Sequence, residues 1–297
     1  MSNRKSREAS ASAADAASRA ATWLVAPALA LLGAVALYPV LAGLGMSFQR
    51  IILVFHERRF IGLANYRELL ADDRFLAALA RTSYFTAVAV GAELVLALPL
   101  AIVLDRAVRG RGFLRAAVLL PWAIPTAVSA KLWAWLLEPG YGILARLWPV
   151  NWLGAPTPAL HAAILVDVWK TTPFVALIIL AGLQAIPADV YAAAEVDGAS
   201  PLRVFRSVTL PLLRPAIVLA VLFRAVDAFR VFDAVYVLTG GGPANATETL
   251  SIYSYKTLLR AGDFGYGAAI AAATFLCVAV LSAVLLRIWA RGAEELA

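Results

Sequence analysis

The stretch "AATWLVAPALALLGAVALYPVLAGLGMSFQ" (residues 20–49) contains no charged side chain. A helix that crosses roughly 30 Å of hydrocarbon needs about 20 apolar residues, so this stretch is long enough to span a membrane. It is longer than the apolar segment of a secretory signal peptide, and no clear A-x-A cleavage site follows it. We therefore expect a retained span near Trp23–Met46, preceded by a short polar tail at residues 1–22.

The rest of the chain repeats this pattern. Of the 297 residues, 62% are hydrophobic and 15% are charged, and the mean hydropathy is +0.79. Soluble domains are about 45–50% apolar and about 25% charged, so a bilayer is the natural solvent for this chain. Five further apolar stretches qualify as spans: 83–104, 113–137, 159–183, 215–239 and 267–290. Lipid offers no partner for an open strand edge. The sequence therefore predicts an all-α, polytopic membrane protein with six transmembrane helices.

The polar residues exclude several classes of function. The net charge of +7 comes from cations that lie mainly between apolar runs, whereas a nucleic-acid binder would gather them on one surface. A single cysteine, Cys277, and two distant histidines, His56 and His161, argue against a disulfide framework or a zinc site. No phosphate-binding G-x-x-x-x-G-K-[ST] motif and no hydrolase motif occurs. We expect neither catalytic residues nor a bound metal or cofactor in this chain.

The distribution of arginine and lysine predicts the orientation. With a cytoplasmic N-terminus, the inside segments hold more of these cations than the outside segments, although the long first outer loop is also rich in arginine. Two compact loops decide the assignment, and their cations are Arg106, Arg109, Arg111, Arg115, Arg287 and Arg291. Both termini are therefore expected in the cytoplasm. The first outer loop is also expected to contain an amphipathic helix around Tyr66–Leu79.

One polar block, "YAAAEVDGASPLRVFRSVTLP" (residues 191–211), lies between the fourth and fifth spans. Ala188–Val196 favours a helix that Gly198 can end in a left-handed conformation. Ser200 followed by Pro201 is typical of the start of a second helix, expected at Pro201–Val208. Pro211 and Pro215 are then expected to break the chain before the fifth span. A solvated connecting loop is the simpler interpretation, but a connector could be much shorter.

This block resembles the EAA loop of ATP-binding-cassette (ABC) importer permeases, whose pattern is E-A-A, three residues, Gly, nine residues and I-x-L-P. The spacing agrees throughout, although Ala192 replaces the leading glutamate and Val208 replaces isoleucine. Other stretches are similar to the sugar-transporting branch of that family, of the type that serves maltose or trehalose systems: "FIGLANYRELL" (60–70), "WKTTPF" (169–174), "AEVDGAS" (194–200), "LPLLRPAI" (210–217) and "YVLTGGGP" (236–243).

The resemblance implies a type I importer permease fold in a bacterial cytoplasmic (inner) membrane. It implies tails at 1–22 and 291–297 around a permease domain at 23–290, with the coupling loop at 187–211. The implied partners are a second homologous permease, a dimeric ABC ATPase that uses ATP and Mg, and a periplasmic or lipid-anchored sugar-binding protein, with no nucleic acid. The residues implied for ATPase coupling are Ala192, Glu195, Asp197, Gly198, Phe205, Leu210 and Pro211.

Ionisable groups within spans mark a pathway or a partner by default. The fifth expected span carries Arg224, Asp227, Arg230 and Asp233 at steps of three residues, which is contact distance on a helix. This ladder is either a self-neutralising stripe or a set of groups that hydrogen-bond sugar hydroxyls. The substrate-path candidates are Asp167, Trp169, Lys170, Asp227, Arg230, Asp233 and Tyr236. Trp169 and Tyr236 can equally pack against other side chains or belong to an aromatic belt at the membrane–water interface.

Two details of the spans carry expectations of their own. Pro173 could unwind a turn of the fourth span near mid-membrane, where transported solutes often bind. Glu93, alone in the second span, is expected to meet a cation from another span. Alternatives to a sugar importer are a permease for another small solute, such as glycerol 3-phosphate, and an ion-driven secondary transporter. The latter is less favoured, because no second copy of the EAA-like block is present.

Overall fold

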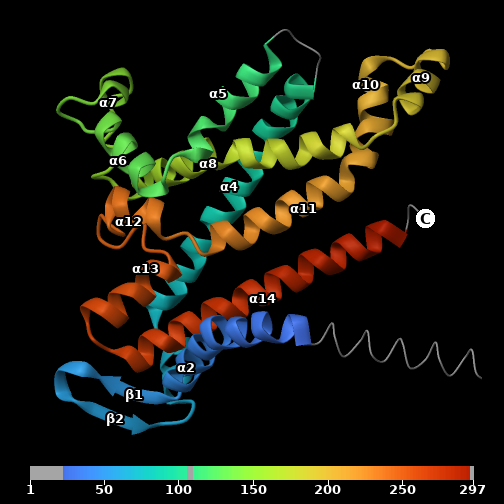
Figure 1. The fold of residues 1–297 in the computed structure, drawn as a ribbon. Coiled ribbons are helices and arrows are strands. Elements are labelled where there is room, and N and C mark those ends of the chain that lie inside the picture. The colour runs from blue at the N-terminus through green and yellow to red at the C-terminus, as the bar shows by residue number, and fades with distance from the viewer. Residues whose placement is uncertain (1–22, 106–109, 295–297) are drawn as a thin grey trace, which may run out of the picture.

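The computed structural model describes residues 23–105 and 110–294, which fold almost entirely into helices (Figure 1). The expected tail at 1–22 and the two loop arginines Arg106 and Arg109 lie outside the described residues. Within them, five helices are long and apolar enough to cross a membrane, and the number is six if a bent pair of helices is counted as one span. The predicted all-α membrane fold is confirmed.

The first span runs from Trp23 to Ser47 and ends in α2 (Tyr38–Ser47). The other long helices are α4 (Asp73–Asp105), α8 (Pro156–Gln184), α11 (Leu210–Phe229) and α14 (Phe264–Glu294). The bent pair is α5 (Arg111–Ala123) and α6 (Thr126–Leu136). The shorter helices are α3 (Ala64–Ala71), α7 (Ile143–Leu147), α9 (Ala188–Val196), α10 (Pro201–Val204), α12 (Asp233–Thr239) and α13 (Leu250–Tyr255).

Helix α8 lies at the centre of the bundle, against α4 and α11, and is the most buried of the spans. Its contacts with these neighbours include small residues such as Ala163 and Ala176, which are fully buried. Small side chains let membrane helices approach closely, because dispersion contacts replace the hydrophobic effect there. By contrast, the first span packs along the outside of α14 and buries almost none of its surface. The core therefore holds α4, α8 and α11 in fixed register.

Three expectations about proline are wrong. Helix α8 continues through Pro173 without unwinding. Neither Pro211 nor Pro215 breaks the chain, because α10 runs into α11 as one helix from Pro201 to Phe229. A π-helical turn at Phe205–Thr209 lies just before Pro211, and there Leu210 donates to the Phe205 carbonyl, one residue further back than in an α-helix. Such a wide turn accommodates a proline that has no N–H to donate.

Two predicted spans are divided in the structure. The third is not one helix over 113–137, since α5 and α6 meet at 89° across Ile124 and Pro125. Ile124 is extended there, as a residue before proline prefers, and Pro125 has no N–H with which to continue the helix. The fifth span ends at Phe229 rather than near Thr239, and α12 begins as a separate helix at Asp233.

The loop between the first and second spans is more structured than expected. It contains an antiparallel hairpin of β1 (Gln49–Ile52) and β2 (Glu57–Phe60), in which Gln49 pairs with Phe60 and Ile52 with Glu57. The amphipathic helix expected around Tyr66–Leu79 is interrupted at Asp72, where α3 ends and α4 begins. Asn65, buried in α3, donates to the carbonyls of Ser47 and Gln49 at 2.8 and 3.0 Å. The loop is thereby fastened to the end of the first span.

Candidate functional site

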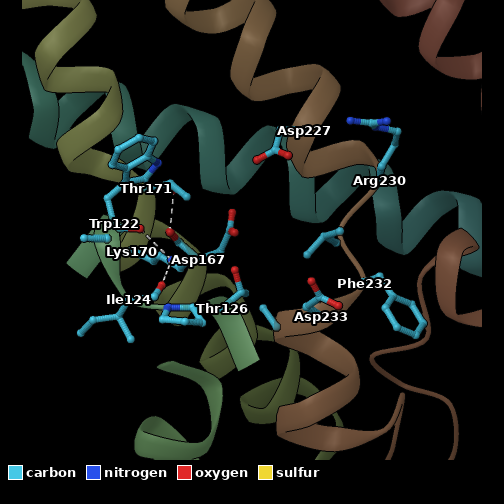
Figure 2. A pocket seen from close by; sticks show the side chains of 14 residues that line it. Trp122, Ile124, Thr126, Asp167, Lys170, Thr171, Asp227, Arg230, Phe232 and Asp233 are labelled. Atoms are coloured by element: carbon cyan, nitrogen blue, oxygen red, sulfur yellow. Dashed lines mark hydrogen bonds between the residues drawn. The ribbon is translucent and has the colours of Figure 1, made fainter. Parts of the chain in front are cut away.

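A cavity of about 510 Å³ opens between α8, the α5–α6 bend and the junction of α11 with α12 (Figure 2). Small-molecule sites commonly have volumes of this size. In Figure 2, the carboxylates of Asp167, Asp227 and Asp233 approach the open centre from different elements, whereas the Arg230 guanidinium turns outward. The cavity is lined by Trp122, Ala123, Ile124, Pro125, Thr126, Asp167, Lys170, Thr171, Asp227, Arg230, Val231, Phe232, Asp233 and Ala234.

Behind the cavity wall, Arg224 of α11 joins carboxylates from three helices. Its guanidinium donates to both oxygens of Glu93 on α4, at 2.6 and 2.7 Å, and to Asp167 on α8, at 2.8 Å. It also donates to Asp227, one turn further along α11. Arg224 and Glu93 are 2% and 0% exposed, whereas the Asp227 side chain is 67% exposed. The cluster therefore runs from the buried core to the cavity surface.

The formal charges of this cluster do not cancel, because one guanidinium faces three carboxylates. A charged group held away from water is costly unless it is paired and hydrogen-bonded. Glu93 meets that condition, since it receives two guanidinium bonds and a 2.7 Å bond from the Thr171 hydroxyl. Asp167 and Asp227 share the same guanidinium and line the cavity. Their unused acceptor capacity is thus available to a solute.

Lys170 makes a different set of contacts. Its ammonium donates to backbone carbonyls at the end of α5, namely those of Ile124 and, at 3.1 Å, Trp122, and it lies 3.5 Å from that of Pro121. These carbonyls have lost their helical partners because the helix stops at Pro125. A lysine from the neighbouring helix thus caps the C-terminus of α5, where the helix dipole favours a cation.

The structure brings together five of the seven residues predicted to lie on the substrate path: Asp167, Lys170, Asp227, Arg230 and Asp233 all line the cavity. Trp169 and Tyr236 do not line it. Trp169 packs edge-on against Trp133, and Tyr236 stacks on Phe232 and receives a 3.1 Å hydrogen bond from Arg260.

The prediction that four charged residues lie along one helix was wrong. Only Arg224 and Asp227 lie on α11 and bond to each other, while Arg230 ends that helix and Asp233 starts the next. The self-neutralising stripe is accordingly limited to one pair. The cation expected for Glu93 is Arg224.

Sequence reasoning missed the aromatic residues of the cavity. Trp122 and Phe232 line it, and Trp122 stacks on Phe174 with ring centroids 5.7 Å apart. The nearby prolines Pro121 and Pro125 were a usable signal, because a helix broken within a span turns side chains toward a cavity. No comparable signal precedes Phe232, whose position depends on the non-helical residues between α11 and α12.

The EAA-like block lies at the opposite end of the bundle from the hairpin and α7 (Figure 1). Helix α9 ends in a Schellman motif, in which Gly198 has a φ of +69°. Gly198 donates to the Glu195 carbonyl and Ala199 to the Ala194 carbonyl, both at 3.0 Å. The predicted left-handed helix end is confirmed. Ser200 does precede the first residue of α10, but its side chain makes no capping bond.

The predicted coupling residues lie on this turn and the helices beside it. Ala192, Glu195, Asp197 and Gly198 are exposed on α9 and its end, whereas Phe205 and Pro211 are half-buried. Apolar side chains are exposed among them, with Val196 at 88% and Leu202 at 58%. The turn is therefore closed by backbone hydrogen bonds, partly apolar and open to contact, while its predicted role in coupling stays a prediction.

A second buried carboxylate lies at the end of the bundle away from the EAA-like block. Glu248, fully buried in the segment between α12 and α13, accepts bonds from Arg74 at 2.8 and 2.9 Å and from Lys256 at 2.7 Å, and Arg81 donates to its backbone carbonyl. Burial tends to raise the pKa of Glu248, but the hydrogen bonds from Arg74 and Lys256 outweigh it and lower the pKa. Nearby, bonds from Tyr253 and Tyr266 likewise outweigh burial and lower the pKa of Asp72.

Comparison with known proteins identifies a family profile that matches residues 93–293, that of the binding-protein-dependent transport system inner membrane component. The chain is 42% identical to the trehalose/maltose transport system permease protein MalF of Thermococcus litoralis, over 89% of this chain and 92% of that protein. It is 44% identical to the trehalose transport system permease protein SugA of Mycobacterium tuberculosis, over 93% of this chain and 90% of that protein.

Among solved structures, a bacterial ABC transporter involved in the import of the acidic polysaccharide alginate contains a similar chain. The TM-score is 0.79 at 21% identity, and the match covers 91% of this chain and 96% of that one. The alginate transporter in complex with an alginate pentasaccharide-bound periplasmic protein matches with a TM-score of 0.75 at 22% identity, over 89% and 93% of the two chains. These matches confirm the predicted importer permease fold.

Proposed function

Since this chain belongs to the family of binding-protein-dependent transport system inner membrane components, we propose that it forms one half of the solute pathway of an ATP-driven sugar importer. The solute is a disaccharide of the trehalose or maltose type, as it is for the two permeases named above. The second half comes from a homologous permease, and a periplasmic or lipid-anchored binding protein delivers the sugar. Both termini lie in the cytoplasm, and the chain itself catalyses no reaction.

The cavity carries this proposal. Sugar hydroxyls need hydrogen-bond acceptors, which Asp167, Asp227 and Asp233 supply, and the apolar faces of sugar rings pack on aromatic side chains such as Trp122 and Phe232. An uncharged polyol satisfies these groups without adding a charge inside the membrane. The combination of several carboxylates with an aromatic wall is therefore the observation on which we rely.

A phosphorylated solute such as glycerol 3-phosphate is the second candidate. Arg230 at the rim of the cavity favours it, since guanidinium groups pair well with phosphate. Three carboxylates in the same wall oppose it, because like charges brought close in a low-dielectric site repel strongly. Lys170 offers little compensation, as its ammonium is committed to backbone carbonyls. The charge balance favours the neutral sugar.

Uptake by the assembled importer in proteoliposomes distinguishes the two. Radiolabelled trehalose, maltose and glycerol 3-phosphate are supplied separately with the importer's binding protein outside and ATP with Mg²⁺ inside. We expect ATP-dependent accumulation of a disaccharide and none of glycerol 3-phosphate. Accumulation of the phosphate ester alone would refute the sugar assignment, and accumulation without ATP would refute the proposed energy source.

The α9–α10 turn is proposed to seat in the partner ATPase, which binds the ATP and Mg. Its support is the rigid Schellman end and the exposed apolar residues beside it. Since α10 continues into α11, a displacement of the turn reaches Asp227 and the cavity along a single helix. This continuity, which the sequence did not predict, offers a direct mechanical route for nucleotide-driven closure.

Gly198→Val tests this coupling. A β-branched residue at φ +69° is strained by about 1–2 kcal/mol, so the turn must change shape. We expect the complex to assemble with normal composition but to lose sugar-stimulated ATP hydrolysis, measured as phosphate release. Gly62→Val, at φ +58° in the first outer loop, is the matched control and should retain stimulation. Full stimulation in the Gly198 variant would contradict the docking role.

A further inference from the structure

The bend between α5 and α6 supplies five of the residues that line the cavity, from Trp122 to Thr126. We call this segment, residues 121–126, the elbow. Its shape begins with Pro125, which stops α5 and leaves the last carbonyls of that helix without partners. Unsatisfied backbone groups within a membrane each cost several kcal/mol, so irregular backbone survives there only where other groups satisfy it. The elbow therefore needs a donor.

Lys170 is that donor, and it has a matching need. Its side chain is largely buried on α8, where an ammonium without partners is equally costly. Asp167 lies one turn before it but is engaged by Arg224 at 2.8 Å. The hydrogen bonds of the ammonium go instead to the elbow, as Figure 2 shows for Trp122 and Ile124. Each partner thus removes the energetic penalty of the other.

The chemistry of the contact suits lysine. The ammonium has three donors around a single point of charge, and three carbonyl oxygens, those of Pro121, Trp122 and Ile124, lie around it. No donor of this set is left over for a solute. The stacking of Trp122 on Phe174, which also belongs to α8, holds the same segment. The position of the aromatic wall therefore depends on both α8 contacts.

From this geometry we infer that Lys170 is a positioning residue: it shapes the sugar cavity by clamping the elbow, and it is not a ligand of the sugar. This inference rests on the proposed function only for the identity of the solute. It assigns Lys170 a role distinct from those of Asp167 and Asp227. If the clamp is released, the peptide groups of the elbow need new partners, the angle between α5 and α6 opens, and the wall that carries Trp122 moves away from the carboxylates.

The angle can be measured without any solute. Nitroxide labels are attached at Phe113→Cys on α5 and Leu132→Cys on α6, in the full chain with Cys277→Ser. Pulsed electron paramagnetic resonance then reports the distance between the labels across the elbow. Both labelled positions are exposed, at 81% and 46%. In Lys170→Met, which keeps the length of the side chain but no donor, we expect a broader distribution shifted to longer distances. Asp227→Asn, as a control on the same cavity, should leave the distribution unchanged.

A Lys170→Gln variant keeps two N–H donors without the charge. We expect its label-to-label distance distribution to lie between those of the parent and of Lys170→Met. It also serves if Lys170→Met does not insert stably. An unchanged distribution in the inserted Lys170 variants would overturn the inference, whether sugar affinity falls, as for a direct ligand, or stays normal. Failure of the disaccharide uptake experiment would refute the solute assignment and would leave the distance measurement interpretable.

Discussion

Two buried carboxylates of this protein have opposite surroundings. Glu93, in the middle of the bundle, shares its single cation, Arg224, with two further carboxylates. Glu248, at the end of the bundle away from the EAA-like block, receives bonds from both Arg74 and Lys256. The central cluster has an excess of acceptors and opens onto a cavity, whereas the Glu248 cluster has an excess of donors and fastens loops together. The difference separates a site whose carboxylates have acceptor capacity left for a solute from one whose carboxylate is bonded entirely within the protein.

The largest effect is expected from Arg224→Met. Removing one member of a buried ionic cluster leaves the others uncompensated, at a cost of about 3–5 kcal/mol. Since Glu93 is fully buried, it cannot recover hydration without disturbing α4, α8 and α11. We expect a large loss of thermal stability for the purified chain in detergent. Arg230→Met is the control, because that side chain is exposed. Equal stability of the two variants would show that the cluster contributes nothing to the fold.

Glu248→Gln is expected to have a smaller effect. The amide keeps one acceptor for Arg74 and Lys256 but no charge, so the loss should be about 1–3 kcal/mol. The measurement is again thermal unfolding, with Glu68→Gln, an exposed residue of α3, as the control. A loss larger than that of Arg224→Met would reverse the comparison between the two clusters.

The pH dependence of the same variant sharpens the comparison. Because folding lowers the pKa of Glu248, its stabilising contribution is complete above its unfolded pKa, about 4.3, and is lost as the pH falls through the folded value. The difference in melting temperature between the parent and Glu248→Gln should therefore be constant near neutral pH and should shrink below about pH 4. A difference that stays constant to lower pH would mean that the carboxylate charge is not what stabilises this region.

Asp227→Asn is expected to change stability least, by about 0.5 kcal/mol or less, because the side chain is largely exposed and Arg224 keeps Glu93 and Asp167. Its effect should appear in transport, as a raised KM for the disaccharide in the uptake measurement. The opposite result, a destabilised protein with normal KM, would place Asp227 with the structural members of the cluster.

Much of the fold followed from one-dimensional patterns. Long uncharged stretches such as 20–49 predict spans, because lipid demands about 20 apolar residues of any helix that crosses it. The end of α9 followed from Gly198, since only a residue without Cβ adopts φ +69° at little cost. Where a local sequence pattern allows only one favourable structure, the prediction from sequence was accurate.

The errors arose where a local rule has several outcomes. Seven prolines lie within the predicted spans, at positions 27, 39, 99, 121, 125, 173 and 215, yet among the described residues the helix breaks only at Pro125. Proline removes one hydrogen bond in every case, but whether the helix then bends depends on what else can satisfy the carbonyls. At the elbow Lys170 reaches across from α8, and no spacing rule connects residues 46 to 49 positions apart.

The amino-acid sequence by itself determined that this is a membrane protein, where most of its apolar helices lie and where the turn that ends at Gly198 lies, because hydrophobicity and backbone conformation act over a few neighbouring residues. Only the tertiary structure decided which charges meet. The acidic residues of the predicted spans lie on the second, fourth and fifth, and the meeting of Arg224 with Glu93, Asp167 and Asp227 depends on how α4, α8 and α11 are rotated about their axes. That rotation comes from close packing of small side chains across the whole bundle, and no single stretch of sequence records it.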